Sequence, residues 1–209
     1  MQKQTIINWL QKFTDTIAQN KDYLTELDAA IGDADHGINM ERGFKKAIEK
    51  LPTVEDKDIG TILKTVSLTL ISSVGGASGP LYGTFFLRAS TAVAGKQELD
   101  AENILELLKT GLEGIIARGK TQLGDKTMVD SLHPAVMAFQ QAINDGVDIT
   151  NAVEKAVAAA EQGMKETIPM IAKKGRASFL GERSVGHQDP GATSVYLMLK
   201  SLDESLNYS

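Results

Sequence analysis

Residues 59–80 read "IGTILKTVSLTLISSVGGASGP", an apolar stripe followed by a stretch of small residues. The apolar side chains of the first half lie three or four residues apart, as on one face of an α-helix: Ile59, Ile62, Leu63, Val66 and Leu70. The second half is rich in glycine and ends at Pro80, which we expect to be the first residue of the next helix. The stretch therefore predicts two helices joined by a glycine-rich loop.

The same helical spacing recurs along the chain. It is present in residues 6–17, 104–115 and 153–164. Alternation of apolar and polar residues, which would indicate strands, is hard to find. Asp100 and either Asp148 or Thr150 precede such stripes and are predicted N-caps. We count roughly eight helical segments and predict one all-α domain over residues 1–209.

Stretches rich in glycine and polar residues separate the predicted helices. They are residues 27–39, 72–83, 118–128 and 175–192. If neighbouring helices run antiparallel, alternate loops lie at the same end of a bundle. We therefore expect these loops to share one rim and to form a site there.

The first of these loops holds a cluster of aspartates within "LDAAIGDADHGINMERGF", residues 27–44. Asp28 ends a short predicted helix, and Asp33 and Asp35 follow in the loop. Clustered carboxylates repel one another unless a cation lies between them, and such hard oxygen ligands suit Mg²⁺ or Ca²⁺. An EF-hand fits poorly, because Phe44 stands where its last glutamate is required. A turn with solvated charges is the other interpretation, but Mg²⁺ shared with a nucleotide phosphate explains the dense carboxylates better.

Two other loops lead into helices whose free N–H groups could bind an anion. The amides of Ala77 and Ser78, or the Ser78 hydroxyl, could contact phosphate, although small residues could equally serve tight helix packing there. Asp189 is a predicted N-cap with Pro190 in the first helical position. Arg176 in the same loop could neutralise a phosphate.

Residues 114–121, "GIIARGKT", match the P-loop pattern G-x-x-x-x-G-K-[ST]. A P-loop needs a preceding strand and a following helix, whereas here the preceding residues have helical spacing. Ile115 and Ile116 continue the apolar stripe instead of forming an exposed cradle. We therefore interpret the segment as the end of a helix and expect Lys120 to contribute little to activity.

The overall composition excludes several classes of function. The formal charge of −5 and the pI near 5.3 argue against sequence-independent binding to nucleic acid or to anionic membranes. The absence of cysteine excludes disulfides and zinc ribbons, so a metal must bind oxygen or imidazole ligands. The polar N-terminal region is unlike a signal peptide, and we expect a soluble cytoplasmic protein.

Taken together, the loops resemble those of the nucleotide-binding L subunits of bacterial dihydroxyacetone kinases. The resemblance rests on "LDAAIGDADHGINMERGF", "SSVGGASGPLYGTFF", "RGKTQLGDKTM" and "GRASFLGERSVGHQDPGATS", which occur in this order. It covers nearly the whole chain. It implies an antiparallel eight-helix barrel with a nucleotide site at one end.

The resemblance also implies which residues form the site. Asp28, Asp33 and Asp35 would bind two Mg²⁺ ions that bridge the phosphates of ADP or ATP. The implied nucleotide contacts are His36, Gly37, Ile38, Asn39, Ala77, Ser78, Gly119, Met128, Arg176, Asp189, Pro190 and Gly191. Met128 would pack on the adenine. No catalytic residue is assigned to this chain, because phosphoryl transfer needs mainly positioning and charge neutralisation.

For partners, the resemblance implies the phosphoenolpyruvate:sugar phosphotransferase system. ADP would stay bound as a coenzyme, a phosphohistidine M subunit would convert it to ATP, and the γ-phosphate would pass to dihydroxyacetone on a K subunit. Three alternatives stay open. The chain could exchange free ATP, it could be the nucleotide domain of a related kinase such as a fatty-acid kinase, or it could be a regulatory module whose nucleotide state is sensed by a transcription regulator.

Overall fold

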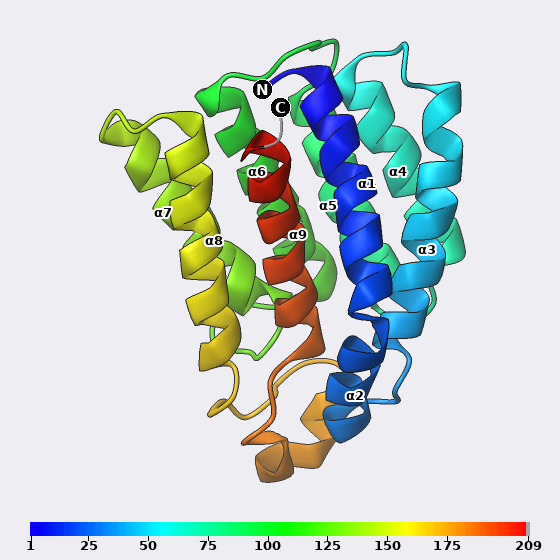
Figure 1. The fold of residues 1–209 in the computed structure, drawn as a ribbon. Helices are drawn as coiled ribbons and strands as arrows, with labels where there is room; N and C mark the ends of the chain where they lie inside the picture. Colours follow the sequence, from blue (N-terminus) through cyan, green and yellow to red (C-terminus); the bar gives the residue numbers. More distant parts are fainter. Residues whose placement is uncertain (208–209) are drawn as a thin grey trace.

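The structure is a computed structural model that describes residues 1–207, and within them it contains α-helices and two 3-10 helices but no sheet (Figure 1). The α-helices are α1 (Lys3–Gln19), α2 (Lys21–Ile31), α3 (His36–Lys50), α4 (Ile59–Ser73), α5 (Ser78–Ala92), α6 (Ala101–Gly119), α7 (Met128–Asn144), α8 (Ile149–Glu166) and α9 (Pro190–Asn207). The 3-10 helices are η1 (Leu51–Thr53) and η2 (Arg176–Ser184). The predicted all-α class is confirmed.

All the α-helices except α2 form a closed ring. Each of α1 and α3 to α9 packs on the next, neighbours run in opposite directions, and α9 returns to α1 (Figure 1). The short helix α2 lies at one end of this ring, against α3, α9 and η2. The predicted antiparallel eight-helix barrel is therefore confirmed, and α2 is the short helix that was predicted before the aspartate loop.

Aromatic side chains fill the centre of the barrel. Phe44 of α3 contacts Phe13, Tyr82 and Phe86 edge to face, with ring centroids 4.7 to 6.1 Å apart. Trp9 is buried beside them, and its indole Nε1 donates a hydrogen bond of 2.9 Å to the Met198 carbonyl. These contacts join α1, α3, α5 and α9, and burial of such large apolar surfaces is the main stabilising term of the fold.

Small residues allow the helices α7 and α8 to approach each other backbone to backbone. A Cβ added at Gly163 would lie 2.1 Å from the carbonyl oxygen of Asp130, so only glycine fits there. The buried Ser131 hydroxyl also donates to the Ala160 carbonyl, at 3.0 Å.

The helix starts were mostly predicted correctly. Asp100 and Asp148 are N-caps, accepting bonds from the amides of residues 103 and 151 at 2.8 and 3.1 Å. Pro80 was predicted as the first residue of its helix, but α5 begins at Ser78. Proline is tolerated there because amides of the first turn have no partner within the helix. Among the described residues, no helix is long and apolar enough to cross a membrane.

Candidate nucleotide and metal site

The four glycine-rich loops meet at the end of the barrel beside α2, as the antiparallel arrangement requires. Between them lies a cavity of about 350 Å³, within the usual size range of small-molecule sites. Its walls come from the α2–α3 loop, the α4–α5 loop (residues 74–77), the α6–α7 loop (residues 120–127) and the α8–α9 connection (residues 167–189). The sequence-based expectation of one shared rim is thus met by the structure.

Most of the residues predicted for the site line this cavity: Asp28, Asp33, Asp35, His36, Ala77, Ser78, Gly119, Met128, Arg176, Asp189, Pro190 and Gly191. The other three do not line it and lie one to three residues further along α3 than His36. Gly37 packs against the Lys21 carbonyl, Ile38 is half-exposed, and the Asn39 side chain accepts a bond from Arg42 at 2.6 Å. A direct nucleotide contact from these three residues stays a prediction.

The three aspartates converge on one point of the cavity wall. Each offers a carboxylate oxygen, and these oxygens lie within 4.8 Å of one another. The turn that brings them together is held by Asp28 Oδ2, which accepts hydrogen bonds from the amides of Asp35 (2.9 Å) and His36 (3.2 Å). Between Asp33 and Asp35, Ala34 has a left-handed φ of 60°.

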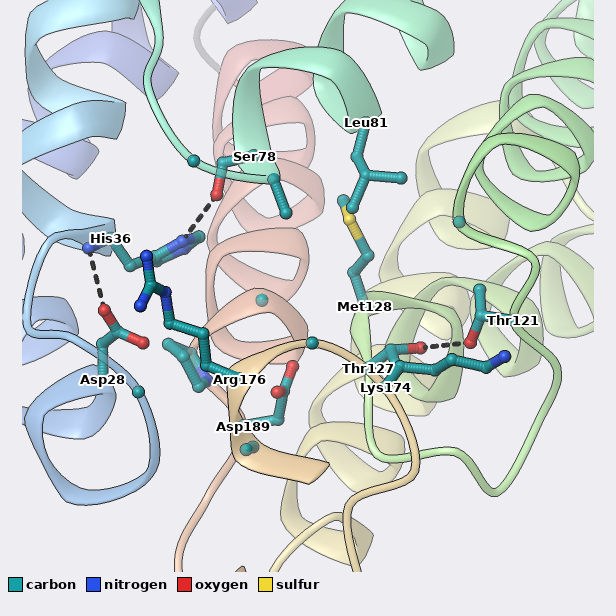
Figure 2. Close-up of a pocket in the computed structure, with 18 of the residues that line it drawn as sticks. Asp28, His36, Ser78, Leu81, Thr121, Thr127, Met128, Lys174, Arg176 and Asp189 are labelled. Carbon is teal, nitrogen blue, oxygen red and sulfur yellow. Dashed lines mark hydrogen bonds between the residues drawn. The ribbon is translucent and has the colours of Figure 1, made fainter. Parts of the chain in front are cut away.

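This cluster fits a divalent metal of the Mg²⁺ type. All three ligands are hard carboxylate oxygens, and the cation nearest to them in the structure is Arg176, whose Nε lies 2.9 Å from Asp33 Oδ2. One guanidinium does not balance the negative charge of three carboxylates, so the three aspartates can also bind a metal cation. Arg176 itself is largely exposed, and its side chain reaches the acidic side of the cavity beside Asp28 and His36 (Figure 2).

His36 connects three helices at the floor of the cavity. Its Nδ1 lies 2.9 Å from Ser78 Oγ of α5, and its Nε2 lies 3.0 Å from Ser194 Oγ of α9. Ser194 accepts from the Tyr82 hydroxyl (2.8 Å) and donates to the Gly191 carbonyl (3.0 Å). We therefore assign the proton to Nε2, so that Ser78 donates to Nδ1. Burial lowers the pKa of His36 to about 4, against the opposing effect of Asp28, and the ring is neutral near pH 7.

Asp189 caps α9 at the cavity wall, as predicted. Its Oδ2 accepts from the Ala192 amide at 2.7 Å, and its own amide donates to Thr167 Oγ1 at 3.0 Å. Burial raises the pKa of the Asp189 carboxyl to about 7, and the bond from Ala192 and the charge of Lys126 oppose that effect. Pro190 has no N–H, and the amides of Ala192 and Thr193 donate to Asp189, so Gly191 carries the amide of this first turn that can serve an anion. That amide lies beside a carboxyl that is easily protonated.

The opposite, less polar wall comes from α5, the α6–α7 loop and the start of α7. Met128, Leu81 and Thr121 lie on the far side of the cavity from Asp28 and His36 (Figure 2). Thr127 and Asp130 form a capping box at the start of α7. Asp130 also accepts from the Gly124 amide, which fixes the loop. The cavity thus has an acidic half and an apolar half.

The P-loop-like string ends a helix, as interpreted from the sequence. Residues 114–119 are the last of α6, and Lys120 is an exposed C-cap with a left-handed φ of 47°. No strand precedes the string in the described chain.

Several lining residues were missed by the sequence analysis: Ile31, Gly32, Gly76, Pro80, Leu81, Ile115, Arg118, Thr121, Lys126, Thr127, Lys174, Gly175 and Ala177. Thr127 could have been found, because a threonine followed three residues later by Asp130 is a capping pattern. Nothing in the local sequence distinguishes Lys126 from an exposed lysine.

The fold and the cavity together define a class of protein: an all-α barrel with a metal- and anion-binding site at one end. The DAK2 domain family matches residues 30–204. The chain belongs to this family.

The relatives include subunits of dihydroxyacetone kinases. The ADP-binding subunit DhaL of the PEP-dependent dihydroxyacetone kinase of Escherichia coli K12 is 52% identical, over 94% of each chain. The corresponding subunit of the PTS-dependent enzyme of Lactococcus lactis is 44% identical over 96% of each chain. The predicted resemblance to a nucleotide-binding kinase subunit is confirmed.

Solved structures agree with this assignment. The crystal structure of the C. freundii dihydroxyacetone kinase in complex with AMP-PNP and Mg²⁺ superposes with a TM-score of 0.73 at 26% identity. The match covers 95% of this chain and 33% of that one, so the chain spans about a third of that kinase's length.

Proposed function

We propose that this chain is the ADP-binding subunit of a phosphoenolpyruvate-dependent dihydroxyacetone kinase, with residues 1–209 acting as one nucleotide-binding domain in the cytoplasm. The observation that carries the proposal is the cavity in which three clustered carboxylates face an apolar wall. The near full-length similarity to subunits of that name supports the same conclusion.

The chemistry of the cavity suggests how a nucleotide would be held. Asp28, Asp33 and Asp35 are the ligands for two Mg²⁺ ions, which neutralise phosphate charge when bound. The amides of Ala77, Ser78 and Gly191 at two helix starts are donors for the phosphates, and Arg176 adds a positive charge. His36 and Gly119 line the same cavity and would also contact the nucleotide, and contacts from Gly37, Ile38 and Asn39 next to it remain part of the proposal. Met128 lies on the wall that suits the adenine ring.

In the proposed reaction, bound ADP accepts a phosphoryl group from a phosphohistidine of the M subunit. The γ-phosphoryl of the resulting ATP passes to a hydroxyl of dihydroxyacetone on the K subunit, and ADP remains. This chain needs to hold and orient the nucleotide rather than react with it. His36 agrees with that role, because its two ring nitrogens are engaged by Ser78 and Ser194.

Mass spectrometry of nucleotide released on denaturation tests the coenzyme role. Protein that has been desalted should release about one ADP per chain. If nucleotide washes out and free ATP supports repeated turnover, the chain exchanges ATP instead.

A reconstitution tests the reaction itself. The chain, the K and M subunits, the general phosphotransferase proteins and phosphoenolpyruvate should together form dihydroxyacetone phosphate, and omission of the M subunit should stop it. If the complete mixture forms no product although ADP is bound, a regulatory role that senses nucleotide state is favoured.

A further inference from the structure

A buried lysine, Lys126, lies next to the cavity. It is in the α6–α7 loop, and its residue is only 1% exposed. Lysine is almost never fully buried unless its charge is compensated, so the surroundings of its ammonium group need an explanation.

The Lys126 ammonium is solvated by backbone carbonyls instead of water. Nζ donates to the carbonyls of Met170 (3.2 Å), Ser184 (2.6 Å) and His187 (2.6 Å). An ammonium has three N–H donors, and these bonds use all of them. Although Lys126 lines the cavity, it therefore has no donor left for a phosphate.

All three carbonyls belong to one segment, the α8–α9 connection, and two of them flank its cavity-facing part. Arg176 lies between Met170 and Ser184, and η2 contains it. Large apolar side chains of the connection are exposed: Ile168 by 37%, Ile171 by 44%, Phe179 by 87% and Val185 by 42%. Few apolar contacts therefore hold the connection in place, and hydrogen bonds and the Arg176–Asp33 ion pair contribute more.

One further bond of the same loop reinforces this attachment: the Lys173 amide donates to the Asp125 carbonyl at 3.0 Å. Within the connection itself, the Ser184 hydroxyl accepts from the Ala172 amide at 2.9 Å. Lys126 adopts a left-handed φ of 62°, an unfavourable backbone conformation for a lysine. The α6–α7 loop is therefore strained at Lys126, the residue whose side chain binds the α8–α9 connection.

We propose that Lys126 is a positioning residue that fixes the α8–α9 connection over the cavity and so determines how long the nucleotide stays bound. The inference rests on the proposed nucleotide-binding function. Removing the ammonium leaves carbonyls of the connection without donors, which favours conformations in which they reach water. In those conformations Arg176 is displaced and the cavity is open.

The test compares Lys126→Met with Lys120→Met. The second variant removes an exposed lysine from the same loop and serves as the matched control. In nucleotide-free protein, hydrogen exchange at the amides of residues 170–187 should accelerate in Lys126→Met and be unchanged in α1 and α4. The release rate of a fluorescent ADP analogue, chased with unlabelled ADP in Mg²⁺, should rise about tenfold or more, as expected for lost charged hydrogen bonds. The control should stay within about twofold of wild type on both measurements.

A general loss of stability would instead accelerate exchange in all helices together, and this result, or an unchanged release rate, would overturn the proposal. Lysine acylation of the wild-type protein gives a second test that needs no folded variant. Lys126 should react far more slowly than Lys120 and should become more reactive when ADP is removed, whereas equal reactivity of the two lysines would refute the attachment. If wild type binds no nucleotide at all, the proposed function fails, while the exchange and acylation comparison still decides whether Lys126 holds the connection.

Discussion

Ala34 is one of three non-glycine residues with positive φ in the described chain, together with Lys120 and Lys126. All three lie in loops that form the cavity end of the barrel. A left-handed conformation costs a residue with a Cβ roughly 1–2 kcal/mol, so it persists only where surrounding contacts impose it. At Ala34 those contacts are the hydrogen bonds that the amides of Asp35 and His36 donate to the Asp28 carboxylate.

Replacing Ala34 by glycine should therefore stabilise the protein. The lost backbone strain exceeds the greater flexibility of glycine in the unfolded chain, which leaves a net gain of about 0.5–1 kcal/mol. Urea denaturation in EDTA measures the difference, and the positions of the aspartates should be kept. A lower stability of Ala34→Gly would show that the turn is not strained.

Asp33 is the aspartate best suited to test the metal site. Asp33→Ala should abolish the increase in thermal stability that Mg²⁺ and ADP give the wild type, about 2.7 kcal/mol at a ligand concentration of 100 times Kd. Asp22→Ala is the matched control, since this aspartate of α2 has a side chain that is 99% exposed. Calorimetric titration with Mg²⁺ and ADP measures both variants. Undiminished ADP affinity in Asp33→Ala would contradict the bridging-metal hypothesis.

At the scale of elements, the end of α6 shows that a sequence can match the P-loop pattern without forming a P-loop. The string at 114–121 has the letters of a P-loop, but its lysine is at an exposed helix end. Lys120→Ala should change ADP affinity and phosphoryl transfer by less than about twofold, because a solvated charge outside the cavity contributes little. A complete loss of transfer in the reconstituted mixture would show that Lys120 reaches the nucleotide.

The helices and most of their starts could be predicted from the sequence because the causes are local. Apolar spacing defines α4 and α6, and Asp100 and Asp148 cap the helices that follow them. The start of α5 was placed two residues late, since proline at the first and at the third helical position is equally compatible with the sequence. The closure of the ring depends on packing between distant helices, and it entered only through the resemblance to a known family.

The site residues, too, could be predicted where their positions have local causes and could not where the causes are distant in the sequence. Asp28, Asp33 and Asp35 were recognised because their convergence follows from one short turn. Lys126 was not recognised, because its role depends on carbonyls 44 to 61 residues away in the sequence. The link from Tyr82 through Ser194 to His36 depends likewise on three separate helices.

For the whole molecule, the two buried titratable groups of the cavity should oppose each other in the pH dependence of stability. His36 has its pKa lowered from 6.5 to about 4, so its contribution to stability is complete above pH 6.5 and is lost as the pH falls toward 4. Asp189 has its pKa raised from 3.8 to about 7, so its contribution is complete below pH 3.8 and is lost as the pH rises toward 7. Between about pH 4 and 6.5 the two slopes have opposite sign and similar size, about 1.4 kcal/mol per pH unit.

Substituting either residue alone should therefore expose a pH dependence of the unfolding free energy that nearly cancels in the wild type. Relative to wild type, nucleotide- and Mg²⁺-free Asp189→Asn should gain about 3 kcal/mol of unfolding free energy as the pH rises from 4 to 6.5, because only the His36 effect remains. His36→Gln should lose a similar amount over the same range, because only the Asp189 effect remains. Urea denaturation at several pH values measures these differences, and surface carboxylates cancel in each comparison with wild type. Curves that run parallel to that of the wild type would show that neither group titrates differently in the folded and unfolded states. Slopes of the expected sign would show that, between about pH 4 and 6.5, the nucleotide-free cavity holds a neutral imidazole and a protonated carboxyl. His36 then adds no positive charge for binding phosphate, and that charge must come from the metal and from basic side chains such as Arg176.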